Sequence, residues 1–120
     1  MADKLLVNLA TGMEDAERVT VAFLVATAAL TQGREVVVWA TKDAVRLGVP
    51  GGMQGEACEG CPPLERLWQQ FVDGGGQLWL CPICVNARGL QDAELASSTT
   101  IAGATPTLEW AGADAMVFSY

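Results

Sequence analysis

Residues 77–82 have the sequence Gln77-Leu78-Trp79-Leu80-Cys81-Pro82. The apolar run is typical of a short buried strand, whereas Pro82 cannot continue a central hydrogen-bonded ladder and favours the first turn of a helix. We therefore expect a strand over 77–81 that passes directly into a helix running toward Arg88 and Gly89. Cys81 would then lie at the carboxyl end of a strand.

The residues before this strand predict a helix that follows a long loop. Residues 62–72 begin with two prolines and carry apolar side chains at helical spacing, and Gly74-Gly75-Gly76 ends the segment. Residues 48–61 contain five glycines and follow neither a strand nor a helix period. Loops of this length in compact domains are often functional.

The same alternation of strand and helix holds nearer the amino terminus. Strands are expected at Leu5–Leu9 and Glu35–Ala40, and a short helix at Lys42–Leu47. Between the strands, Thr11-Gly12-Met13-Glu14 has the form of a capping box and predicts a helix reaching about Gln32. This helix is apolar nearly all round, so we expect its second face to meet another subunit or to be enclosed within the chain.

The carboxyl-terminal third completes the predicted fold. It favours a strand around Thr100–Ala102, a helix near Thr107–Ala111 and a last strand at Ala115–Phe118. The alternation implies right-handed crossovers between parallel strands. We expect one domain over residues 1–120, with a three-layer α/β/α architecture and a mostly parallel sheet of about five strands.

Composition narrows the classes of partner. The 120 residues carry a formal net charge of −7, which opposes binding to nucleic acid or anionic membranes. The apolar stretch Val19–Leu30 is too short to cross a bilayer, and no secretory signal is visible, so a cytoplasmic location is expected. Histidine is absent, which excludes Ser–His and Cys–His catalysis and histidine-ligated metal sites.

The chemistry available to the chain is that of four cysteines: Cys58, Cys61, Cys81 and Cys84. In a reducing cytoplasm such residues are more often catalytic or metal-binding than structural disulfides. Cys81 is expected at the carboxyl edge of the sheet, where ligand sites of parallel sheets lie, and the amides of a following helix favour the thiolate. Cys84, one turn further, has the position of a second thiol that attacks a mixed disulfide or persulfide on the first. The opposing interpretation is a buried, inert cysteine.

Other candidate site residues follow from the same topology. The loop after the first strand opens at the same edge, so Asn8, Thr11 and Gly12 are expected to face the thiol. Arg88 is a candidate partner of a thiolate or substrate anion, although a solvated surface arginine fits the sequence equally well.

The segment Cys81-Pro-Ile-Cys-Val-Asn-Ala-Arg88-Gly89, preceded by an apolar strand, resembles the cysteine segment of the DsrE/DsrF-like (TusD-like) sulfur-relay family. The resemblance extends over the whole chain in the order of its strands and helices. It implies a small α/β fold that assembles as homotrimers, hexamers or hetero-oligomers. It also implies a sulfurtransferase-like carrier without a cofactor, in which Cys81 accepts persulfide sulfur from a donor protein and passes it to an acceptor protein.

The first cysteine pair departs from that family pattern and supports an alternative. Cys58-Glu-Gly-Cys61 and Cys81-Pro-Ile-Cys84 together give Cys-x2-Cys-x19-Cys-x2-Cys, a spacing typical of four-thiolate zinc sites. A helix beginning at Pro62 would start at the edge where the third strand ends, so both pairs can converge there. Zinc or an iron–sulfur cluster would then make the protein an oligomeric metal-binding module, and bound metal would suppress sulfur transfer.

Overall fold

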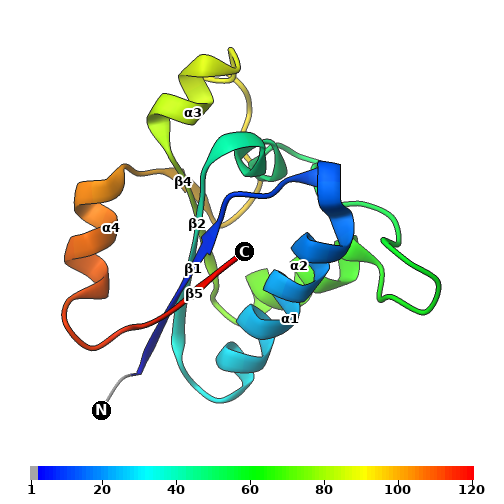
Figure 1. Ribbon diagram of the computed structural model, residues 1–120, viewed down its shortest axis with the longest axis horizontal. Coiled ribbons are helices and arrows are strands. Elements are labelled where there is room, and N and C mark those ends of the chain that lie inside the picture. The colour runs from blue at the N-terminus through cyan, green and yellow to red at the C-terminus, as the bar shows by residue number, and fades with distance from the viewer. Residues whose placement is uncertain (1–2) are drawn as a thin grey trace.

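The computed structural model describes residues 3–120; Met1 and Ala2, part of the amino-terminal segment considered above, lie outside the described residues. Its centre is a five-stranded sheet in the order β4-β3-β2-β1-β5, and every neighbouring pair of strands is parallel. Helices cover both faces of this sheet (Figure 1). The predicted three-layer α/β/α fold and five-stranded sheet are confirmed.

The strands follow the apolar runs of the sequence. They are β1 (Lys4–Leu9), β2 (Glu35–Ala40), β3 (Gln77–Leu80), β4 (Thr99–Ile101) and β5 (Met116–Ser119). The central strands β1 and β2 are buried on both faces, which is why they read as continuous apolar runs rather than as an alternating pattern. All four residues of β5 are exposed, as befits a strand at the sheet edge with sparse cover.

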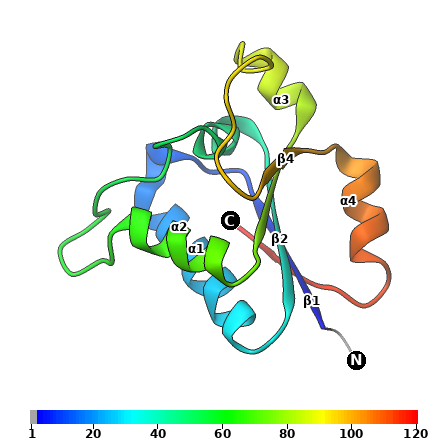
Figure 2. The same cartoon turned by 180° about the vertical axis from the view of Figure 1, so that it is seen from behind.

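The helices are distributed unequally over the two faces. Two of them, α1 (Ala16–Thr31) and α2 (Leu64–Asp73), pack side by side on one face, and α4 (Ala104–Ala111) lies on the other. The short helix α3 (Pro82–Ala87) stands beyond the carboxyl end of β3, as Figure 2 shows from behind. Two 3-10 helices, η1 (Met13–Asp15) and η2 (Lys42–Gly48), follow β1 and β2 at the same edge of the sheet.

The main core lies between the sheet and the pair α1 and α2. Phe23 and Phe71 are fully buried there, with ring centroids 5.1 Å apart in an edge-to-face arrangement, and Trp68 stacks on Phe71 at 5.6 Å. The opposite face has a smaller cluster in which Trp79 meets Trp110 of α4 at 6.1 Å. The protein therefore has one deep apolar layer and one thin layer.

The start of α1 differs from the predicted capping box. Thr11 does not cap the helix; instead η1 intervenes, and the Asp15 carboxylate accepts a hydrogen bond from the Arg18 amide at 3.1 Å. Glu14 does reach back, but to the amide of Gly12, at 2.8 Å. The α-helix begins later than predicted because the tight turn satisfies the first donors and Asp15 supplies the cap.

The outer face of α1 is uncovered within the protomer. Val21 and Leu24 are 43% and 44% exposed, so the interpretation of a helix enclosed on all sides by its own chain is wrong. The remaining expectation, contact with another subunit, stays a prediction. Within residues 3–120, no helix is sufficiently long and apolar to cross a membrane.

Candidate thiol site

Cys81 links the end of β3 to the first turn of α3. Its amide donates to the Ala40 carbonyl at 2.9 Å, continuing the ladder with β2, and its carbonyl accepts from the Val85 amide at 3.0 Å. Pro82 occupies the first helical position, where a missing N–H costs nothing. The thiol is free and partly exposed. The sequence prediction of a cysteine at a strand-to-helix junction is thus realised in the backbone.

Cys84 is also a free thiol, one turn along α3. It packs against the main core beside Val85, which is fully buried. Ile83, between the two cysteines, is 77% exposed. The helix start leaves the amides of Ile83 and Cys84 without intrahelical acceptors, and the Cys81 side chain makes no capping hydrogen bond to them.

Arg88 fastens α3 to η2. Its Nε donates to Asp43 Oδ1 at 2.6 Å, and its Nη1 donates to the Cys84 carbonyl at 3.3 Å. The hydrogen bond from Arg88 holds the pKa of the Asp43 carboxyl below its ordinary value, and the charge of Arg46 at 3.6 Å acts in the same direction. Arg88 therefore positions the thiol-bearing helix. Sequence reasoning did not select Asp43, although an acid in the short helix after the second strand shares the site's edge.

The other predicted binding residues lie at the same edge but have partners of their own. Asn8 Nδ2 contacts Ser119 Oγ at 3.4 Å, across the pair β1 and β5. Thr11 is buried, and Gly12 packs so closely on η2 that a Cβ there would lie 2.7 Å from the Asp43 carbonyl oxygen. Of these residues, Gly12 packs against η2, and η2 in turn contacts α3 through Asp43.

The strand order reverses at β1, between β2 and β5, and not at the cysteine strand. Chain order runs from β1 outward through β2, β3 and β4 before β5 returns to the other side of β1. At the reversal, backbone bonds close the edge: Ala10 donates to Tyr120 at 3.0 Å and Tyr120 to Asn8 at 2.8 Å. Cys81 follows β3, so it shares the carboxyl edge with the reversal point but stands two strands away from it.

The structure does not gather the four cysteines. Cys58 and Cys61 form a disulfide with a Cα–Cα distance of 5.1 Å, while Cys81 and Cys84 remain thiols. Figures 1 and 2 place the loop that carries the disulfide beyond the starts of α1 and α2, away from α3. Across residues 3–120, no three Cys, His, Asp or Glu side chains form a group suited to a metal ion. The four-thiolate arrangement does not fit this structure, because a disulfide offers no thiolate ligands and the two pairs are separate.

The family assignment rests on a match along almost the entire chain. The model of the DsrE/DsrF-like family matches residues 3–119. The protein belongs to the DsrE/DsrF-like family. This family is generally associated with sulfur relay. A search among curated proteins found no significant match.

Solved structures agree with the fold of this DsrE/DsrF-like chain. The YchN protein from E. coli superposes with a TM-score of 0.78 at 20% identity, covering 98% of this chain and 99% of YchN. BT1422 from Bacteroides thetaiotaomicron, described as a conserved protein of unknown function, gives 0.65 at 17% identity, with 98% and 95% coverage. At these identities the likeness concerns the fold alone.

Proposed function

We propose that this DsrE/DsrF-like protein carries sulfane sulfur as a persulfide on Cys81. The observation that supports this most directly is the free, partly exposed thiol at the junction of β3 and α3 in a chain of this family. The amides of Ile83 and Cys84 at the start of α3 have no intrahelical acceptors and are available as donors to the persulfide. Arg88 and Asp43 hold α3 at a fixed position from which a partner protein reaches the thiol.

The proposed chemistry transfers one sulfur atom without net oxidation. In loading, the Cys81 thiolate attacks the outer sulfur of a donor persulfide, forms a new S–S bond and releases the donor thiolate. In discharge, an acceptor thiolate attacks the outer sulfur on Cys81, and Cys81 leaves as thiolate. Cys84 offers a second outcome, in which its thiolate attacks the inner sulfur, forms a Cys81–Cys84 disulfide and releases hydrosulfide.

The experiment is native mass spectrometry of anaerobically purified protein with and without cysteine persulfide. We expect one added sulfur per protomer in the parent, none in Cys81→Ser, and undiminished loading in the matched control Cys58→Ser/Cys61→Ser. Cys84→Ser should load normally but should no longer form the internal disulfide. A Cys81→Ser variant that loads as well as the parent would show that sulfur is carried elsewhere. A bound metal lost together with Cys58 would favour the metal-binding alternative.

We also propose that the carrier works as a homo-oligomer, with the exposed face of α1 as a subunit contact. Val21 and Leu24 supply apolar surface there, and burying this surface would offset the repulsion between protomers that carry a net negative charge. Light scattering coupled to size exclusion should report a trimer or hexamer for the parent and smaller species for Val21→Glu/Leu24→Glu. Glu17→Gln serves as a control on the same helix. A monomeric parent would refute this part of the proposal.

A further inference from the structure

We propose that Cys58 and Cys61 form a second thiol site, a reversible dithiol–disulfide couple at the tip of the loop before α2. The structure joins these two residues, and both are partly exposed. Their redox chemistry does not depend on sulfur transfer at Cys81, because the loop lies apart from α3 (Figure 1). The redox proposal for Cys58 and Cys61 can therefore be tested independently of the sulfur-carrier function proposed for Cys81.

The backbone forms the turn that brings the two cysteines together. The Cys61 amide donates to the Cys58 carbonyl at 3.1 Å, closing a four-residue turn. Gly60, inside this turn, has a φ of +86°, which glycine adopts without steric cost. The Cα atoms of the bonded pair are 5.1 Å apart, within the range that a disulfide spans. Because the hydrogen bond and Gly60 also define this turn, we infer that the reduced pair keeps the same backbone.

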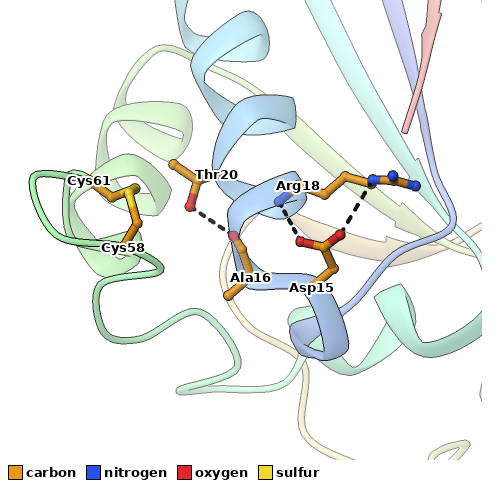
Figure 3. Close-up of a disulfide and its surroundings, with 6 residues drawn as sticks. All are labelled: Asp15, Ala16, Arg18, Thr20, Cys58 and Cys61. Atoms are coloured by element: carbon orange, nitrogen blue, oxygen red, sulfur yellow. Dashed lines mark hydrogen bonds and ion pairs between the residues drawn. A yellow bond between two sulfur atoms is a disulfide. The ribbon is translucent and has the colours of Figure 1, made fainter.

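Two hydrogen bonds join the ends of the loop segment that carries this turn. Gly55 accepts a hydrogen bond from the Leu64 amide at 2.8 Å, and its own amide donates to Glu65 Oε2 at 2.8 Å. The residues between Gly55 and Leu64 therefore project as a short excursion fastened to the first turn of α2. Figure 3 shows the resulting disulfide beside the first turns of α1.

A disulfide here contributes little to folding stability. It closes a ring of only four residues, and the loss of chain entropy in the unfolded state grows with the length of the closed loop. Structural stabilisation is therefore a weak reason for this pair, whereas Cys-x2-Cys spacing at two partly exposed cysteines suits thiol–disulfide exchange.

The exchange needs a dithiol partner as reductant. One partner thiolate attacks a sulfur of the Cys58–Cys61 bond, giving a mixed disulfide and one free cysteine thiolate. The second partner thiol then attacks the mixed disulfide and releases the other cysteine. Two electrons and two protons thus pass from the partner dithiol to the pair, and the partner becomes a disulfide. The reverse sequence oxidises the pair.

Charge around the tip indicates which partner thiols react well. Glu56 and Glu59 are exposed beside the cysteines, whereas Arg66 is exposed on the first turn of α2. The nearby Arg18 and Asp15 pair with each other at 3.7 Å (Figure 3). The tip is therefore negative on balance, and thiols in neutral or basic surroundings should approach it faster than anionic ones.

The test is a redox titration of the whole protein in buffers of reduced and oxidised dithiothreitol, followed by alkylation and peptide mass spectrometry. We expect Cys58 and Cys61 to convert together and reversibly between dithiol and disulfide. The Cys81→Ser/Cys84→Ser variant should titrate identically. A pair that stays a disulfide in excess dithiothreitol, or that never forms one in oxidised buffer, would overturn the proposal, as would zinc retained by all four cysteines.

A rate measurement tests the partner chemistry. At low salt, cysteamine should reduce the pair severalfold faster than 2-mercaptoethanesulfonate at equal thiolate concentration. Added salt, or the Glu56→Gln/Glu59→Gln variant, should bring the ratio of the two reduction rates closer to one. Equal rates in the parent would overturn the preference for neutral or basic partners.

Discussion

Arg88 and Asp43 join the thiol-bearing helix to the turn after β2, with 2.6 Å between Nε and Oδ1. Their side chains come from segments that are 45 residues apart in the sequence, and Arg88 is only 22% exposed. Because Arg88 also donates to the Cys84 carbonyl, a single guanidinium contacts both α3 and η2. This contact therefore holds α3, the helix that begins directly after Cys81, against η2.

Acid should release this contact. The pKa of Asp43 is lowered in the folded protein, chiefly by the Arg88 hydrogen bond. The stabilising effect of the contact is therefore fully present above the ordinary value of 3.8 and is lost as the pH falls through the lower pKa of the folded protein. We expect amide exchange in α3, corrected for intrinsic rate, to accelerate as the pH falls below about 4 in the parent but to be already fast and nearly pH-independent in Asp43→Asn. Equal pH profiles in the two proteins would contradict this role.

Gly12 should tolerate no side chain. An alanine Cβ at Gly12 would lie 2.7 Å from the Asp43 carbonyl oxygen. That oxygen belongs to the backbone, so it cannot rotate away as a flexible side chain can. We expect Gly12→Ala to lower the free energy of unfolding by about 1–3 kcal/mol, since overpacking forces the backbone to move. Gly103→Ala is the matched control, because its Cβ would meet only Pro82 at an ordinary 3.7 Å. Chemical denaturation measures both, and an equally small effect would refute the clash.

The local pattern of the sequence was sufficient to predict the layers, the strand β2 with its observed bounds and the placement of Cys81 at a strand end. Those features depend on runs of neighbouring residues. The partner of Arg88 could not be predicted, because Asp43 reaches it only through tertiary packing. The spacing of the four cysteines was equally compatible with one shared site, and only the course of the loop at 49–63 shows that the pairs are separate.

Truncation of the Phe71 ring should be far costlier than truncation of an exposed ring on the sheet edge. It is fully buried and contacts both Phe23 and Trp68. Urea unfolding should show a loss of about 3–5 kcal/mol for Phe71→Ala, because the truncation removes apolar contacts and leaves a cavity. Phe118→Ala, on the exposed edge strand, should cost much less. Similar losses for both variants would mean that the core between α1, α2 and the sheet is not the main source of stability.

Trp39 should control access to Cys81 through a hydrogen bond. Its indole Nε1 donates to the Ala102 carbonyl at 2.9 Å, and the Ala102 amide donates to Leu80, the residue before Cys81. Trp39→Phe removes the indole donor and leaves that carbonyl unpaired, so we expect a loss of about 1 kcal/mol and a severalfold faster alkylation of Cys81. Trp79→Phe is the matched control, since within residues 3–120 the Trp79 ring contacts Trp110 without an indole hydrogen bond. It should lose stability through packing while Cys81 keeps the parent rate. Equal acceleration in both variants would show that general loosening, and not the bond to Ala102, sets the exposure of the thiol.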